Sequence, residues 1–167
     1  LTEFMHPRAE EIAGMLPAAM GAKVEANPRT MARLDRWFNK GRRVRTHRLG
    51  NFLMLYVLGG LRGYRRRTLR HRYEQAHLAR WLDKVKAAVA QDYAVAVELV
   101  RCRRLVKGYS DTHARSLSKF DRVMEGADLV RGRADAAQWI ARLREAALQD
   151  EKGAALDGAI LTVRSFA

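Results

Sequence analysis

Residues 69–108 read LRHRYEQAHLARWLDKVKAAVAQDYAVAVELVRCRRLVKG, and their apolar side chains recur at the spacing of an α-helix. The periodic positions are Leu78, Leu82, Val85 and Val89 in the first half, with Trp81 beside them, and Val95, Leu99, Cys102 and Val106 in the second. A turn near Asp92 separates the two halves. We therefore predict an antiparallel pair of helices, with Gly108 in the left-handed conformation at the C′ position of the second.

The rest of the chain also carries helical signals, without the alternation, hairpin dipeptides or repeat period of β and repeat proteins. Asn27 and Pro28 suit the N-cap and first position of one helix, and Thr68 suits the cap of another. Helices are expected over residues 8–16, 28–40, 49–61, 112–126 and 134–149, and the pattern of residues 154–166 fits a helix or a strand. The predicted fold is an all-α helical bundle with a long antiparallel helix hairpin and an N-terminal arm.

The last two predicted helices have clear apolar faces. The residues expected to point inward are Leu117, Phe120 and Met124 in the first, and Ala136, Ile140, Leu143 and Ala147 in the second. Asp111 or Thr112 is expected to cap the first of these helices, Gly126 to end it, and Gly153 to end the second. As domains, we expect residues 1–27 to be a connecting arm from a preceding domain and residues 28–167 to be the helical domain.

The composition favours a cytoplasmic protein without disulfide bonds. The 167 residues include one cysteine, Cys102, which cannot form an internal disulfide and cannot alone hold an iron–sulfur cluster, which needs about four thiolates. Its place in the helical pattern predicts a buried, inert thiol. Because the chain begins at Leu1 and not at a methionine, we expect it to be part of a longer polypeptide.

Positive charge is concentrated between Lys40 and Arg80, where twelve Lys and Arg residues face only one acidic residue, Glu74. We call ten of them the arginine cluster: Arg42, Arg43, Arg45, Arg48, Arg62, Arg65, Arg66, Arg67, Arg70 and Arg72. An apolar run, residues 49–61, divides the cluster. A membrane span needs about 20 apolar residues, so we expect this shorter run to form a helix in the core and not to span a membrane, with a contact at a membrane interface as the alternative.

Four interpretations of the arginine cluster stay open at this point. The cluster can be a solvated or internally paired face, a basic docking surface for an acidic protein partner, a nucleic-acid-binding surface, or a site for an anionic cofactor tail. The charge suits nucleic acid, but no zinc-finger motif, recognition-helix motif or aromatic stacking platform accompanies it.

Other residues that could carry chemistry are isolated. Glu74 and His77 form an E-x-x-H pair, but a di-iron bundle needs a second such pair. Ser110, Asp111 and His113 include the residue types of a hydrolytic triad, yet residues so close in sequence rarely converge as a triad must. The phosphate-binding patterns G-x-x-x-x-G-K-[ST] and G-x-G-x-x-G are absent from the sequence.

Two stretches resemble a known family. Residues 3–21 read EFMHPRAEEIAGMLPAAMG, and residues 104–124 read RLVKGYSDTHARSLSKFDRVM. Both resemble the C-terminal region of the beta-type subunit of bacterial indolepyruvate:ferredoxin oxidoreductase, a 2-oxoacid oxidoreductase. In that family an oxidoreductase domain precedes a helical domain of unassigned function. The K-G-Y-x-D-T-H order is the more specific part of the match.

The resemblance implies an accessory structural or subunit-docking role, without catalysis in this segment. The family's thiamine diphosphate, iron–sulfur clusters and coenzyme A would then bind elsewhere in the complex, and the partners would be its other domains or subunits; a homo-oligomer is a further alternative. The residues carried over by the motif are Lys107, Gly108, Tyr109, Asp111, Thr112 and His113. As a separate hypothesis, Lys107, Tyr109 and His113 could line an anion pocket at a helix N-terminus. The alternative function is a basic helical nucleic-acid-binding protein.

Overall fold

The computed structural model describes residues 2–5, 7–108, 110–149 and 152–166; it leaves the side chains of residues 2–5, 42, 110 and 111 undescribed. The described chain is all-α apart from one short sheet, so the predicted fold class is confirmed. It divides into two compact units, unit 1 (Leu1–Ala79) and unit 2 (Arg80–Ala167), and the boundary falls inside helix α5 (Leu69–Val89). Among the described helices, none has the length and apolar character that crossing a membrane requires.

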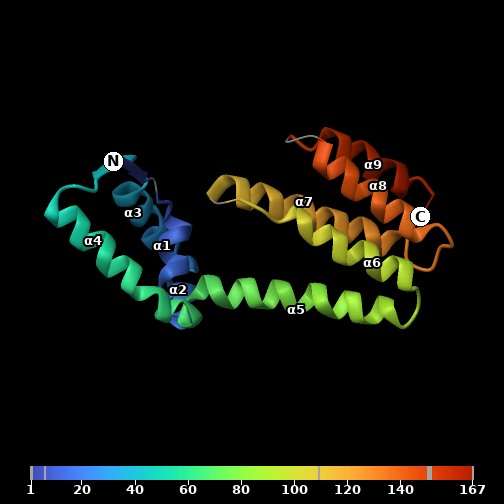
Figure 1. Ribbon diagram of the computed structural model, residues 1–167, viewed down its shortest axis with the longest axis horizontal. Coiled ribbons are helices and arrows are strands. Elements are labelled where there is room, and N and C mark those ends of the chain that lie inside the picture. Colours follow the sequence, from blue (N-terminus) through green and yellow to red (C-terminus); the bar gives the residue numbers. More distant parts are fainter. Residues whose placement is uncertain (1, 6, 109, 150–151, 167) are drawn as a thin grey trace. The chain divides into compact units, whose positions relative to one another are not determined.

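Unit 1 consists of short helices, a two-stranded sheet and the start of α5 (Figure 1). Its elements are β1 (Thr2–Met5), α1 (Ala9–Met15), α2 (Ala18–Glu25), α3 (Pro28–Phe38), β2 (Arg42–Arg45), α4 (Leu49–Gly60) and the 3₁₀ helix η1 (Leu61–Arg67). Helices α1, α2 and α3 contact one another, so much of the segment expected as an arm packs with α3. A link from this segment to a preceding domain stays a prediction.

The sheet is an element that the sequence pattern did not predict. Strands β1 and β2 pair in antiparallel register, with Thr2 opposite Arg45 and Met5 opposite Arg42. Each strand has only four residues, which is too short for a clear alternating pattern, and the pairing joins segments far apart in the sequence.

The core of unit 1 forms where α1 and α2 meet the first residue of α5. Ala9, Ala13 and Leu69 are buried, and the backbone N–H of Leu69 donates to the carbonyl oxygen of Leu16 at 3.0 Å. Gly21 of α2 lies against this contact. A Cβ atom at Gly21 would be 2.6 Å from the carbonyl oxygen of Ala13 and 2.9 Å from Leu69 Cβ, so only glycine fits without a shift.

Two predicted helix caps are confirmed. Helix α3 begins at Pro28, and Asn27 Oδ1 accepts two backbone N–H groups of the first turn, at 3.1 and 3.2 Å. Before α5, Thr68 Oγ1 accepts the N–H of His71 at 3.3 Å. These side chains satisfy N–H groups that have no partner within the helix.

The predicted hairpin is also confirmed, because the chain reverses after α5 and α6 (Tyr93–Arg101) runs back at an angle to it (Figure 1). Asp92 begins α6, and its Oδ1 accepts two backbone N–H groups at 2.8 and 3.2 Å. The indole Nε1–H of Trp81 on α5 donates to the carbonyl oxygen of Leu99 on α6, at 3.0 Å. Trp81 therefore joins the two helices by a directional bond.

The face of α5 that packs on the core differs from the predicted one. Val85 packs there as expected, together with Trp81 and Ala88, whereas Leu82 and Val89 are 38% and 53% exposed. Apolar residues lie next to each other along this helix, so the repeat alone does not show which of two neighbours faces inward.

The end of the hairpin also needs one correction. Helix α6 ends at Arg101 and a 3₁₀ helix, η2 (Cys102–Leu105), follows it. Gly108 adopts the predicted left-handed conformation, with φ of +84°, but it lies beyond η2 and not at the C′ position of the α-helix.

Three further helices complete unit 2: α7 (Ser110–Leu129), α8 (Ala136–Gln149) and α9 (Ala154–Arg164). They pack against one another, and α8 also contacts α6. The residues predicted to face inward on α7 and α8 are buried, except Leu117, which is half-buried. Residues 154–164 are helical, which settles the open choice between helix and strand.

Three predicted helix ends on α7 and α8 are wrong. Helix α7 begins at Ser110, so Asp111 and Thr112 lie in its first turn and do not cap it. Helix α7 also continues past Gly126 to Leu129, because Gly126 packs against α8: a Cβ there would be 2.7 Å from Leu143 Cδ1. Gly153, with φ of +87°, is the N-cap of α9 and not the end of α8.

Candidate functional site

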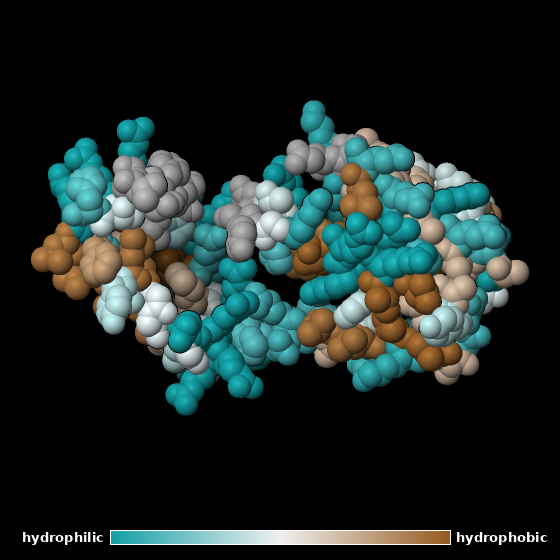
Figure 2. Space-filling model, in the orientation of Figure 1, coloured by the Kyte–Doolittle hydropathy of each residue, from teal (hydrophilic) through white to brown (hydrophobic). Residues whose placement is uncertain are grey.

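Helix α4 is the most unusual surface feature of unit 1. Its apolar side chains, together with that of Leu61, form what we call the α4 surface: Leu49, Phe52, Leu53, Met54, Tyr56, Val57, Leu58 and Leu61. These side chains are 41% to 73% exposed, and no residue of α4 is buried among the residues that the structure describes. Figure 2 shows brown hydrophobic surface over α4, bordered by hydrophilic side chains.

The exposure of α4 contradicts the expectation that residues 49–61 form a core helix. The helix itself forms as predicted and ends at Gly60. Asn51 Nδ2 donates to the carbonyl oxygen of Arg45 at 3.1 Å, which ties the first turn of α4 to β2. A helix that is apolar on all sides is normally buried, so the exposed α4 surface indicates a missing contact.

Positive side chains flank the α4 surface along the chain. The nine arginines of the cluster whose side chains are described are all exposed: Arg43, Arg45, Arg48, Arg62, Arg65, Arg66, Arg67, Arg70 and Arg72. The side chain of Arg42 lies outside the described residues. Unit 1 as a whole contains 16 Lys and Arg against six Asp and Glu, whereas unit 2 contains 16 against twelve.

Few of these arginines are neutralised by a neighbour. Within the part of the chain that is described, Arg65 and Arg70 form ion pairs, both with Glu74, at 3.1 and 2.9 Å. Partial burial tends to raise the pKa of Glu74, but hydrogen bonds from Arg70 and Arg65 outweigh this and hold the pKa below its usual value. Among the other cluster members whose side chains are described, none has an ion pair with a described residue. The cluster therefore leaves most of its charge available to a partner.

The K-G-Y-x-D-T-H motif lies at the junction of η2 and α7. Lys107, Gly108 and Thr112 are exposed and His113 is half-buried, while Tyr109 and the side chain of Asp111 lie outside the described residues. Ser116, which the sequence analysis did not single out, organises this junction. Its Oγ accepts the N–H of Lys107 at 3.2 Å and lies 2.8 Å from the carbonyl oxygens of Lys107 and His113.

A small cavity of about 110 Å³ adjoins this motif. Its lining includes Lys107 and Thr112 from the motif, and the cations of Arg115 and Lys119; His113 is not among the described residues that line it. Lys119 Nζ donates to the carbonyl oxygen of Ala147 at 3.2 Å. The space holds only a few water molecules, so the lining fits a small anion at most.

The remaining candidates have structural roles. Cys102 is fully buried, as predicted, and burial raises the pKa of its thiol to about 12. Glu74 of the E-x-x-H pair is held by arginines, as described above. Among the described residues there is no group of three or more His, Cys, Asp or Glu side chains arranged to hold a metal ion.

Fold and surface together define a basic all-α protein with an uncovered apolar helix in unit 1. Residues 1–126 match a family of unknown function, DUF6537, and because this match covers most of the chain, the protein belongs to that family. The matched segment contains all of unit 1 and extends into α7 of unit 2. No curated protein and no solved structure matches the chain.

Proposed function

We propose that this chain is a non-catalytic accessory domain that docks onto other subunits or domains of an indolepyruvate:ferredoxin oxidoreductase-like enzyme. The observation that carries docking is the α4 surface: a whole helix of large apolar side chains left open to water. Contiguous apolar surface of this kind usually marks a site for a partner. The link to that particular enzyme rests on the resemblance of residues 3–21 and 104–124.

The partner surface should combine an apolar centre with acidic residues around it. Burial of Phe52, Leu53 and Val57 would supply most of the favourable free energy, about 25 cal/mol for each Å² of apolar surface removed from water. The unpaired arginines before and after α4 would select an acidic partner and speed the encounter.

The proposed division of labour follows from the chemistry of the described residues. The single cysteine has a pKa of about 12 and is buried, so it is suited neither to nucleophilic attack nor to binding a cluster. Iron–sulfur clusters would therefore be bound by the partners, and the resemblance implies the same for thiamine diphosphate and coenzyme A.

The test is co-purification of the full chain with the other subunits of the enzyme. The double variant Leu53→Ser, Tyr56→Ser should weaken binding by about tenfold or more, because it removes two exposed anchors of the α4 surface. The matched control is Leu161→Ser, which changes a leucine on α9 whose exposed fraction, 65%, lies between those of Leu53 (50%) and Tyr56 (72%). Unchanged association of the double variant would refute docking through α4. Failure of the wild-type chain to associate would refute the proposed partner.

Nucleic acid is the rival partner, favoured by the unpaired arginines. It explains less of the surface, because aliphatic side chains such as Leu53 and Val57 gain nothing from a phosphate backbone. Binding of a labelled oligonucleotide that falls steeply between about 50 and 200 mM salt, and that survives Leu53→Ser, Tyr56→Ser, would favour the rival. No binding at low salt would eliminate it.

A further inference from the structure

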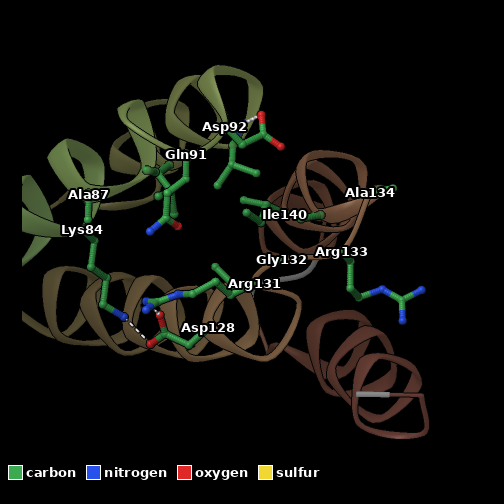
Figure 3. Close-up of a pocket in the computed structure, with 15 residues that line it drawn as sticks. Lys84, Ala87, Gln91, Asp92, Asp128, Arg131, Gly132, Arg133, Ala134 and Ile140 are labelled. Atoms are coloured by element: carbon green, nitrogen blue, oxygen red, sulfur yellow. Dashed lines mark hydrogen bonds and ion pairs between the residues drawn. The ribbon is translucent and has the colours of Figure 1, made fainter.

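Unit 2 contains a cavity of about 390 Å³. The proposed docking function does not involve this cavity. The cavity lies where the end of α5 and the start of α6 face the end of α7 and the start of α8 (Figure 3). Its floor is apolar and buried, formed by Leu99, Ala127, Ala136 and Ile140. Pockets for small molecules in proteins occupy about 300–1,000 Å³, so the volume suits a compact ligand.

One rim of the cavity has more hydrogen-bond donors than acceptors. Asp128 accepts from both Lys84 Nζ and Arg131 Nη2, the latter at 2.9 Å, so both of its carboxylate oxygens are occupied. Lys84 Nζ also lies 3.4 Å from the carbonyl oxygen of Met124. Two cations thus share one carboxylate, and most of the N–H groups of Arg131 have no partner among the described residues.

The other charged groups of the lining do not cancel this excess. Asp92, on the opposite side, caps the N-terminus of α6, whose partial positive charge it balances. Arg133 points away from the cavity in Figure 3 and pairs with Asp135 at 2.8 Å. In the same view Arg131 extends across Asp128 toward Lys84. The side chain of Gln91 points from the end of α5 toward Arg131.

The rim is also accessible to a ligand. The side chains of Lys84, Asp128 and Arg131 are 31%, 44% and 66% exposed. A guanidinium presents a planar pair of N–H groups that matches the two oxygens of a carboxylate. Beside this rim, the buried floor of the cavity consists of aliphatic side chains without charge.

We propose that this cavity binds a small carboxylate with a compact apolar body. The carboxylate lies against Arg131 and Lys84, with the Gln91 amide beside it, and the apolar body rests on Leu99 and Ile140. Binding is non-covalent and independent of the docking proposal, because all of its residues belong to unit 2 and none to the α4 surface.

The probe is 3-cyclohexylpropionate, with 3-cyclohexylpropanamide as its uncharged counterpart, titrated into the full chain and followed by amide and methyl NMR. We expect the acid to shift signals of Ile140 and Ala136, and the amide to bind about tenfold more weakly or worse, since it loses the charge-assisted bonds. Shifts confined to residues outside the cavity, or equal binding of acid and amide, would overturn the proposal.

Two variants localise the site. Arg131→Gln should lower the affinity for the acid by about tenfold while leaving that for the amide nearly unchanged. Ala87→Phe, on the exposed rim of α5, should obstruct both ligands. Arg164→Gln, on α9 and outside the cavity, is the matched control for the loss of one positive charge and should change neither affinity. If Arg131→Gln and Arg164→Gln behave alike, the binding is a general effect of the basic protein and the proposal fails.

Discussion

Replacement of Gly21 by alanine should destabilise unit 1, although alanine is the better helix former. Gly21 lies inside α2, where its missing side chain allows α1 and α5 to approach closely. A Cβ atom would stand 2.6 Å from the carbonyl oxygen of Ala13 and 2.9 Å from both Cβ and Cδ2 of Leu69. The first neighbour is backbone and Leu69 is fully buried, so neither can move aside by changing a rotamer.

The magnitude is a difference of two terms. Alanine in place of glycine within a helix gains about 1 kcal/mol from propensity. Overpacking a tight contact costs about 1–3 kcal/mol, and the backbone contact places Gly21→Ala at or above the upper end. The net expectation is a loss of about 2 kcal/mol or more in the stability of unit 1.

Hydrogen exchange followed by mass spectrometry measures this loss locally. Peptides covering α1, α2 and the start of α5 should exchange faster in Gly21→Ala than in the wild type. Gly59→Ala is the matched control, since Gly59 is also helical, also in unit 1, and has no atom within 4 Å of the added Cβ. Gly59→Ala should leave exchange in these peptides unchanged. If Gly21→Ala protects α2 instead of exposing it, the reasoning from the close contact is wrong.

Three further substitutions or measurements test unit 2. Glu98→Ala should lower the unfolding free energy of unit 2 in urea by about 1–3 kcal/mol, because Arg144, only 13% exposed, loses its 3.3 Å ion pair with Glu98 and keeps only the pair with the exposed Glu145 at 3.5 Å; a change below about 0.5 kcal/mol would contradict this. Cys102 should resist alkylation in the native protein and react once urea is added. Because burial raises the pKa of Cys102 to about 12, the unfolding free energy should fall as pH rises from about 9 toward 12, and this fall should be absent in Cys102→Ala. Gly108→Ala should cost about 1 kcal/mol or more and lower the melting temperature, because φ is +84° and the added Cβ would be 2.5 Å from Thr112 Cγ2; an unchanged melting temperature would contradict the strain.

Local signals in the sequence were enough to place many elements. The Asn27-Pro28 start of α3 depends on a side chain that caps its own helix, so no distant contact is needed to predict it. The apolar face of α8 was predictable for a similar reason: Ile140, Leu143 and Ala147 repeat at helical spacing, while the charged Arg142 and Glu145 mark the exposed side.

Distant contacts decided the features that were missed. In the sequence Gly126 predicts a helix end, but in the structure its missing side chain leaves space for Leu143 of another helix. The run 49–61 predicts a helix from its composition, yet composition does not specify what covers it, and its exposure came only from the structure. The β1–β2 pairing likewise depends on two short segments that meet across the chain.

The cavity in unit 2 shows the same limit for a candidate site. Lys84 and Arg131 are brought together by Asp128, which lies 44 positions from Lys84. The only local signal was the i,i+3 spacing of Asp128 and Arg131, which is common on ordinary solvated helices. The motif 107–113, in contrast, stood out in sequence, but its junction is held by Ser116, which carries no distinguishing pattern.

The uncovered α4 helix also has a practical consequence for work with this protein. At low ionic strength the net charge of +14 keeps molecules apart, which protects the exposed leucines and aromatics from one another. Added salt shortens the range of that repulsion to about 10 Å at 0.1 M, and a salt such as ammonium sulfate also strengthens apolar association. Solutions of the isolated chain should therefore become turbid on adding salt, and a partner that covers α4 should keep them clear.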